Sequence, residues 1–230
     1  MAQEIILYHG SINILEEPEY GRGRKNNDFG RGFYCTKHNE LAKEWAVSSL
    51  ENGFSNRYSF NMEHLKILNL NSREYTILNW IAVLVEHRLF AIDNPGARRA
   101  KRYLMDNFGI NVNAYDVVIG YRADDSYFDF AEAFLNNSIT VNQLAGAIKL
   151  GELGEQIVLK SQYSFSKLKY EGYEVALSSE YFDSRRKRNE NAIEQYYKLL
   201  ENEDDGLYIQ DIIRGGVTNE DSRIPRNVFE

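Results

Sequence analysis

Strand-like and helical patterns occupy separate stretches of this 230-residue sequence, and this segregation does most to limit the folds open to the chain. Short apolar or alternating runs typical of strands occur on both sides of a long helical stretch. They lie at residues 4–9, 33–36, 57–62, 65–70, 115–120 and 156–160, with further extended structure expected over 163–175. The pattern predicts an α+β fold.

The helical stretch forms an insertion over about residues 71–110. Ser72 can cap a helix from Arg73 to Phe90, and Asn94 with Pro95 opens a second that ends near Phe108. Helical patterns return over 126–136 and 141–150, and again from Ser178 to Leu200. We therefore expect one domain over residues 1–177 and a charged helical C-terminal arm over residues 178–230.

Composition excludes several classes of protein. The formal charge of −7 argues against a broadly cationic surface that binds nucleic acid. No apolar run reaches the roughly 18 residues that a membrane span needs, and the first ten residues lack the segments of a secretion signal. Cys35 is the single cysteine, and the four histidines lack metal-ligand spacing, so we expect no disulfide and no metal site. A cytoplasmic location fits these features.

The first motif with chemical potential is Tyr8-His9-Gly10-Ser11, at the end of the first predicted strand. A histidine there can hydrogen-bond a ribose hydroxyl, and the adjacent glycine lets its backbone N–H and C=O approach a flat ligand closely. The alternative is an ordinary strand-end histidine with a structural hydrogen bond.

The second motif runs from Asp28 to Thr36 and reads Asp-Phe-Gly-Arg-Gly-Phe-Tyr-Cys-Thr. Two glycines around Arg31 predict a tight turn into a strand, with Tyr34 at the lip of a cleft. Trp45 lies on the inner face of the following helix, predicted over residues 40–50 and capped by Asn39. The two aromatic rings fit a sandwich around a planar ligand, and the alternative is that both belong to the core.

The third motif is the predicted strand Gln156-Ile-Val-Leu-Lys160. Strand alternation puts Gln156 and Lys160 on one face and Glu155 on the other.

Taken together, these segments resemble the ADP-ribosyltransferase superfamily, on the side of the poly(ADP-ribose) polymerases and diphtheria-type toxins. That group has a His-Gly-Ser/Thr strand, then Gly-x-Gly-x-Tyr opening a strand and helix, then a strand headed by Glu. The same order appears here as His9-Gly10-Ser11, Gly30-Arg31-Gly32-Phe33-Tyr34 and Gln156-Ile157-Val158. The second motif is also similar to that of a bacterial branch of the superfamily, and the resemblance covers about residues 4–50 and 115–176.

The resemblance implies a split β-sandwich and NAD as the substrate. The implied activity is mono-ADP-ribosyl transfer or NAD cleavage of the bacterial toxin or conflict type. For an acidic chain, a protein is favoured over a nucleic acid as the macromolecular acceptor. In the implied site His9 binds a ribose hydroxyl, Gly10 and Ser11 meet the nicotinamide half, Tyr34 and Trp45 stack on the nicotinamide, and Arg24 or Arg31 lies near the pyrophosphate.

The sequence departs from that group at its catalytic carboxylate, where Gln156 stands. Glutamine can hold a ribose hydroxyl but carries no charge to stabilise a cationic ribosyl group. Asp124 or Asp125 can supply a carboxylate from a loop, and Ala42 stands where the polymerases have a serine. Replacing Gln156 by Glu is therefore expected to raise NAD cleavage. The alternatives are a catalytically inactive NAD or ADP-ribose binder and an interaction protein.

The C-terminal arm is expected to lie outside the NAD pocket. Its basic run, residues 185–188, fits a solvated face. Apolar side chains recur at helical spacing at Ile193, Tyr196, Tyr197 and Leu200. We expect this stripe to pack on the main domain, and contacts with a second copy of the chain or with an inhibitor protein are the alternatives.

Overall fold

The fold is that of a computed structural model, which describes residues 4–90, 92, 94–123, 125–150, 154–202 and 204–226, and the side chains of these residues except those of residues 125–128. The strands are β1 (Glu4–Ser11), β2 (Phe33–Cys35), β3 (Gly53–Asn61), β4 (Ile67–Asn69), β5 (Val117–Tyr121), β6 (Glu155–Leu159) and β7 (Leu168–Ala176). The helices are α1 (Asn39–Ala46), α2 (Ile77–His87), α3 (Pro95–Phe108), α4 (Asp125–Leu135), α5 (Val141–Ala147), α6 (Gln162–Phe165), α7 (Ser178–Leu200) and α8 (Ile209–Gly215). A short 3-10 turn covers Val112–Ala114.

The strands form two sheets, which makes the fold α+β. A three-stranded antiparallel sheet has the order β1-β3-β7, and a four-stranded sheet has the order β2-β6-β5-β4. Only the β4–β5 pair is parallel within the four-stranded sheet. Tyr8 and Thr36 pair across the two sheets and bring the end of β1 beside β2.

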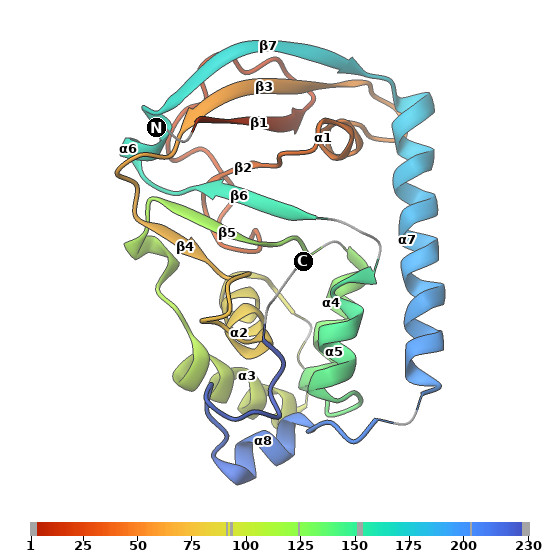
Figure 1. The fold of residues 1–230 in the computed structure, drawn as a ribbon. Coiled ribbons are helices and arrows are strands. Elements are labelled where there is room, and N and C mark those ends of the chain that lie inside the picture. The colour runs from red at the N-terminus through yellow and green to blue at the C-terminus, as the bar shows by residue number, and fades with distance from the viewer. Residues whose placement is uncertain are drawn as a thin grey trace.

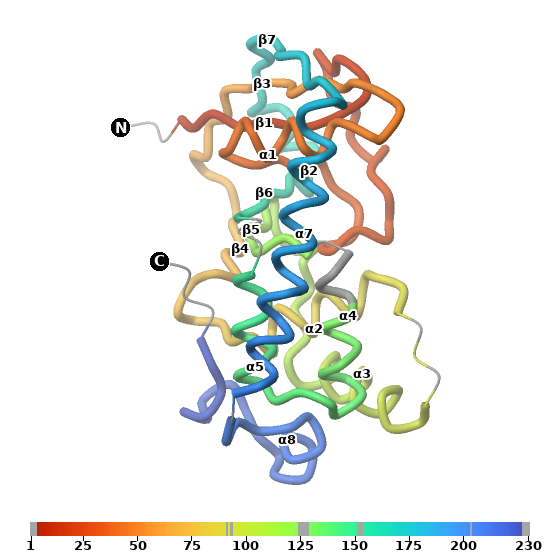
Figure 2. Tube along the Cα trace, turned by 90° about the vertical axis from the view of Figure 1, so that its right-hand side faces the viewer, coloured from red at the N-terminus to blue at the C-terminus, as the bar shows by residue number. Residues whose placement is uncertain are grey.

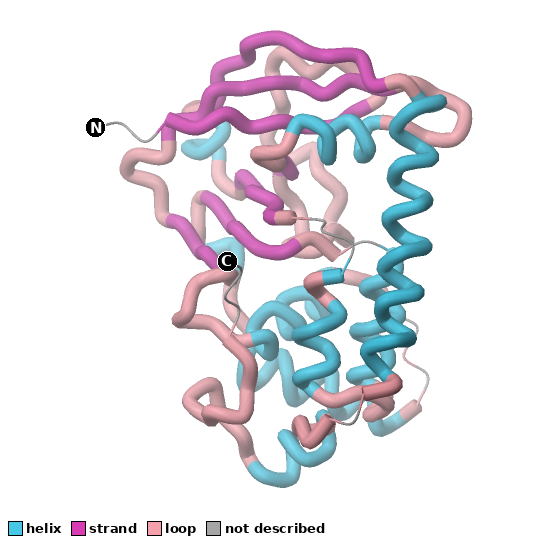
Figure 3. The backbone as a smooth tube through the Cα atoms, turned by 45° about the vertical axis from the view of Figure 1, so that its right-hand side comes forward, coloured by secondary structure: helices cyan, strands magenta, loops and turns pink. Residues whose placement is uncertain are grey.

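The four-stranded sheet is the middle of three layers (Figures 1 and 3). Successive side chains along its strands point to opposite faces, and both faces are packed. Ile157 packs with Leu7 of β1 against the three-stranded sheet, whereas Val158 faces the helices. Because both faces of the sheet are covered, every residue of β5 is buried. The side chain of Gln156 shares the face of Val158, so it points toward the helical layer.

The helical layer contains the predicted insertion, but its first helix begins later than expected. Ser72 is not the cap: α2 starts at Ile77, where Thr76 and Asn79 form a capping box. Thr76 also bridges to Arg226, which fixes this starting point through a contact distant in sequence. The second helix begins as predicted, with the Asn94 side chain accepting from the Ala97 N–H. Asn39 likewise is not a cap but the first residue of α1, and it hydrogen-bonds Ser55.

The C-terminal arm packs on the rest of the chain. Helix α7 runs along one side of the molecule from the sheets to the helical layer (Figures 1 and 2). Tyr196 packs on Phe130 with the two rings tilted and their centroids 4.0 Å apart. Tyr197 is 63% exposed, so it does not belong to the buried apolar stripe as predicted. A helix that the sequence did not predict, α8, buries Ile209 and Ile212 in the same core. None of the described helices is long and apolar enough to span a membrane.

Candidate functional site

A cavity of about 280 Å³ opens where both sheets, α1 and α7 meet. It is lined by His9, Gly10, Asn27, Asp28, Tyr34, Trp45, Arg88, Arg122, Ala123, Gln156 and Arg185. These residues come from eight separate stretches of the chain, so tertiary packing assembles the site.

His9 reaches the cavity from the end of β1 in one defined tautomer. Its Nδ1 lies 2.7 Å from the Tyr34 carbonyl oxygen, which can only accept, so Nδ1 carries the proton. Its ring stacks on Phe33 at 4.3 Å. Burial lowers the pKa of His9, and the hydrogen bond to Tyr34 offsets part of that shift. The ring is therefore neutral at pH 7, with Nε2 as a hydrogen-bond acceptor.

Gly10 is needed for close packing of helix α1 on β1. A Cβ at this position would collide with the Ala42 carbonyl oxygen. Tyr8 exchanges backbone hydrogen bonds of 2.8 and 2.9 Å with Thr36, so its peptide groups point away from β3. Backbone groups alternate in direction along a strand, so the N–H and C=O of Gly10 also point away from β3. Gly10 lies beyond the Tyr8–Thr36 pair. Its N–H and C=O form a donor–acceptor pair at the edge of the cavity.

Tyr34 hydrogen-bonds the backbone of the loop of residues 27–32, which we call the Asp28 loop. Its hydroxyl donates to the Gly30 carbonyl oxygen (2.6 Å) and accepts from the Phe29 N–H (3.0 Å). Burial raises the pKa of Tyr34, and the nearby Asp28 raises it further. With its hydroxyl occupied by the loop, the tyrosine presents its ring to the cavity.

Lys160 secures the same loop from the other side. Its Nζ donates to the carbonyl oxygens of Phe29 (2.6 Å) and Arg31 (2.7 Å). Burial lowers the pKa of Lys160 to about 8. Phe29 is fully buried against Gly120, where a Cβ would collide with its ring. The Asp28 loop is thus fixed by hydrogen bonds and by packing.

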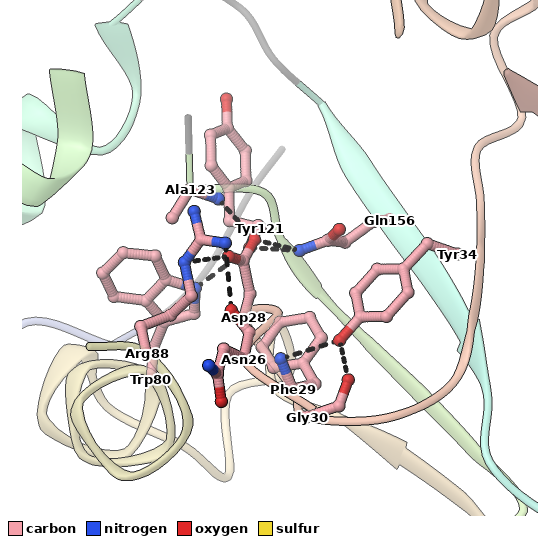
Figure 4. A network of polar contacts seen from close by, with 10 residues as sticks. All are labelled: Asn26, Asp28, Phe29, Gly30, Tyr34, Trp80, Arg88, Tyr121, Ala123 and Gln156. Carbon is pink, nitrogen blue, oxygen red and sulfur yellow. Dashed lines mark hydrogen bonds and ion pairs between the residues drawn. The ribbon is translucent and has the colours of Figure 1, made fainter. Parts of the chain in front are cut away.

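Asp28 is a carboxylate in the wall of the cavity, and only 5% of it is exposed (Figure 4). Its Oδ2 accepts from Gln156 Nε2 (2.7 Å) and from the Ala123 N–H (3.0 Å). Its Oδ1 lies 3.4 Å from Arg88 Nε. Burial is the largest influence and leaves the pKa of Asp28 raised, although Arg88, the two N–H donors and Arg122 offset part of that shift. All of these neighbours are donors or cations, which suits the ionised form.

Gln156 is held in one orientation by Asp28. Its Nε2 faces the Asp28 carboxylate and the Tyr121 carbonyl oxygen, at 2.7 and 3.5 Å, and both partners can only accept. The amide oxygen must therefore point away from Asp28, as Figure 4 shows. Glu155 lies on the opposite face of β6, where it accepts from Asn71 and pairs with Lys37.

Three arginines from different elements also line the cavity. Arg88 follows α2, Arg122 follows β5, and Arg185 comes from α7. The Arg122 guanidinium lies over the Trp45 ring, 4.1 Å from its centroid. This cluster gives an acidic protein a locally cationic cavity.

Helix α7 therefore contributes to the cavity, contrary to the expectation that the arm lies outside it. Arg188, in the basic run expected to be solvated, contacts the buried Glu44 of α1 at 2.7 and 3.1 Å. This bidentate ion pair holds α7 on α1 and places Arg185 at the cavity.

The structure brings most of the residues singled out in the sequence into this cavity. Those that line it are His9, Gly10, Tyr34, Trp45 and Gln156. Ser11 does not line it, because its Oγ accepts from the Asn13 N–H in the turn after β1. Arg31 is exposed, since Lys160 holds its carbonyl inward and leaves its side chain outside. Arg24 is exposed as well. Asp124 lies outside the described residues, and so does the side chain of Asp125.

Six residues line the cavity that the sequence did not mark as site residues, namely Asn27, Asp28, Arg88, Arg122, Ala123 and Arg185. Asp28 is the first residue of the second motif, but nothing in the sequence indicated that its carboxylate would be buried against Gln156. The arginines had no shared motif at all.

Cys35 and possible metal ligands were also considered as sites. Cys35 is fully buried between the sheets, and burial raises the pKa of its thiol, so it is a protonated core residue. Among the residues that the structure describes, no group of three or more His, Cys, Asp or Glu side chains is placed to hold a metal ion.

Residues 5–170 match the family described as "Protein of unknown function (DUF3990)". No curated protein and no solved structure is significantly similar to the chain. The match spans well over half of the sequence and contains every cavity residue except Arg185. The protein therefore belongs to the DUF3990 family.

Proposed function

We propose that the protein binds NAD in this cavity and transfers its ADP-ribosyl group to a macromolecular acceptor. The observation that carries the proposal is the convergence of three sequence motifs, at His9-Gly10, Tyr34 and Gln156, on one cavity that arginines also line. The proposal includes the finer fold assignment, an ADP-ribosyltransferase-like split β-sandwich. The two sheets packed over one apolar core support it.

The nicotinamide half of NAD matches the neutral side of the cavity. The N–H and C=O of Gly10 are complementary to a carboxamide, and the rings of Tyr34 and Trp45 offer flat contact. His9 Nε2 accepts from a ribose hydroxyl. The cavity is at the small end of ligand pockets, so it holds only part of a dinucleotide.

The pyrophosphate matches the cationic side. Guanidinium groups pair with phosphate oxygens through parallel N–H donors, and Arg122 and Arg185 line the cavity from different elements. In this arrangement the adenosine lies outside the cavity.

The reaction breaks the bond between the ribose C1′ and the nicotinamide nitrogen. The bonding electrons leave with nicotinamide, and a cationic ribosyl group develops at C1′. The acceptor's nucleophilic atom then bonds C1′ and releases its proton to solvent. Because the chain carries a formal charge of −7, a protein is favoured over a nucleic acid as the acceptor.

The test is to incubate the purified protein with NAD and a cell lysate and to quantify released nicotinamide by chromatography. Calorimetry with NAD and ADP-ribose gives the affinities. Arg122→Gln should weaken both ligands by about tenfold, the loss of a charged hydrogen bond. Arg186→Gln is the matched control, since Arg186 pairs with Asp183 and Glu190 of its own helix and does not line the cavity.

Failure of millimolar NAD to bind would contradict the proposal. Binding of NAD and ADP-ribose without release of nicotinamide would support a second candidate, an NAD or ADP-ribose binder without turnover. The neutral amide of Gln156 at the position of the superfamily's glutamate favours that candidate.

A further inference from the structure

A cationic ribosyl group needs a negative charge near C1′, and Gln156 has none. Asp28 is the carboxylate that the structure describes in the wall of the cavity, and it is hydrogen-bonded to the Gln156 amide. We propose that Asp28 is a positioning residue that supplies this charge through Gln156, so that the pair performs the task of a single glutamate. The proposal rests on the function proposed above.

The pair has a defined polarity. Gln156 Nε2 donates to Asp28 Oδ2 at 2.7 Å, which turns the amide oxygen away from Asp28 (Figure 4). An amide whose N–H bonds a carboxylate becomes a stronger acceptor at its oxygen, because hydrogen bonds in series polarise one another. The Gln156 oxygen can therefore accept from a ribose hydroxyl and concentrate negative potential beside C1′.

Asp28 also balances the cations around it. Arg88 lies 3.4 Å from its Oδ1, and Arg122 lowers its pKa through space. Without the carboxylate, the arginines that attract pyrophosphate would oppose the cation forming at C1′. Because the wall of the cavity at Asp28 is buried, solvent screens that opposition only weakly.

The carboxylate is held in place before any ligand arrives. Tyr34 and Lys160 together make four hydrogen bonds to the backbone of the Asp28 loop. Phe29, next to Asp28, is fully buried. A fixed charge stabilises a transition state without the cost of reorganising at the moment of reaction.

This geometry reverses the expectation that Gln156→Glu raises NAD cleavage. The introduced carboxylate would replace the Nε2 donor and face both Asp28 and the Tyr121 carbonyl oxygen, which are acceptors. Two carboxylates at that distance cannot both ionise, so one takes up a proton or the pair separates. We expect Gln156→Glu to lower turnover.

The first experiment uses Asp28→Asn, which keeps the shape and an acceptor for Gln156 but removes the charge. Turnover of NAD should fall by roughly 10²-fold, the scale of one preorganised electrostatic contact. The affinity for ADP-ribose should stay the same or rise, because the cavity becomes more cationic. A merely structural role for Asp28 would lower binding and turnover together. Glu155→Gln is the matched control on the opposite face of β6 and should change neither.

The second experiment moves the charge. In the double variant Asp28→Asn/Gln156→Glu the donor and the acceptor of the pair exchange places, and the net charge stays as in the wild type. Its turnover should exceed that of each single variant by at least about tenfold. Full turnover in Asp28→Asn, or a double variant no better than Gln156→Glu alone, would overturn the role of Asp28 while leaving NAD cleavage standing. A wild-type protein that releases no nicotinamide would overturn both proposals.

Discussion

The two sides of the cavity differ in how their residues are held. His9, Gly10, Tyr34 and Gln156 form what we call the strand wall, and Arg88, Arg122 and Arg185 form the arginine wall. In the strand wall, His9 and Tyr34 bond backbone carbonyls of neighbouring segments. In the arginine wall, Arg88 lies against the Asp28 carboxylate and Arg122 over the Trp45 ring. Apart from Gln156, which the Asp28 side chain orients, the strand wall is therefore held through backbone groups, and the arginine wall depends on tertiary contacts between side chains.

The comparison also separates two chemical tasks. The strand wall presents neutral acceptors, donors and rings, which suit an uncharged flat group and a sugar. The arginine wall presents charge, which suits phosphate. Asp28 lies where the walls meet, since it contacts Gln156 of one and Arg88 of the other.

The largest effect should come from the ion pair that supports the arginine wall. Arg188→Met removes the partner of Glu44, whose side chain is 6% exposed, and leaves a carboxylate buried beside α7. Loss of one partner of a buried pair costs about 3 kcal/mol, so the free energy of unfolding in urea should fall by that amount. ADP-ribose affinity should fall too, because Arg185 lies one helical turn away on α7.

The double variant Glu44→Met/Arg188→Met should recover much of that stability, since it buries no unpaired charge. Arg186→Gln, which removes only exposed ion pairs, should stay within about 0.5 kcal/mol of the wild type. If Arg188→Met is as mild as this control, α7 is held by something other than the ion pair.

The next effect tests the strand wall. Tyr34→Phe keeps the ring but leaves the Phe29 N–H and the Gly30 carbonyl oxygen without their partner. The free energy of unfolding should fall by about 2 kcal/mol, the cost of unsatisfied buried backbone groups. The difference in affinity between NAD and ADP-ribose should stay unchanged, because the ring is still present.

Tyr34→Ala removes the ring as well, so it should weaken NAD relative to ADP-ribose by about 0.5–1.5 kcal/mol. Equal losses for the two ligands would show that Tyr34 only supports the Asp28 loop.

The same contrast explains what the sequence could predict. The α+β class, the start of α3 and the opposite faces of Gln156 and Glu155 follow from local patterns of capping and alternation. The start of α2 does not, because Thr76 bridges to Arg226 at the far end of the chain. Helix α8 was missed because its seven residues lie in an otherwise polar tail.

For the site, the sequence indicated the strand wall and missed the arginine wall. Residues of the strand wall lie within short motifs, so their neighbours in the sequence mark them. Arg88, Arg122 and Arg185 lie on elements that meet only in the folded chain. Asp28 was visible in a motif, but its burial against Gln156 depends on the β6 strand 128 residues away.

A smaller effect concerns pH and His9. Burial lowers the pKa of His9 from 6.5, so the unfolded chain takes up a proton first as the pH falls. His9 therefore contributes stability that is present above pH 6.5 and is lost as the pH falls through the folded-state pKa. Protonation also removes the Nε2 acceptor, so NAD affinity should fall by about tenfold in acid, roughly one neutral hydrogen bond.

Titration of the His9 ring by NMR gives its folded-state pKa, and calorimetry at several pH values gives the affinity. In His9→Gln, which cannot titrate, this acid-dependent loss should be absent. A loss that persists in His9→Gln would place the titrating group elsewhere, and Asp28 is the next group to examine.

The smallest effect concerns a contact that holds the arginine wall, where Arg122 covers one face of the Trp45 ring at 4.1 Å. A cation over a half-buried ring contributes about 0.5–1 kcal/mol, and lysine cannot reproduce the flat stacking of guanidinium. A double-mutant cycle of Arg122→Lys and Trp45→Leu should therefore give a coupling free energy of that size in the ligand-free protein.

Nicotinamide stacking on the same face of Trp45 must displace the Arg122 guanidinium, whereas ADP-ribose has no nicotinamide to do so. The coupling should consequently vanish when the cycle is repeated with saturating NAD and persist with ADP-ribose. Coupling that survives both ligands would mean that nicotinamide does not use this face of Trp45, and the ring contact would then come from Tyr34 alone.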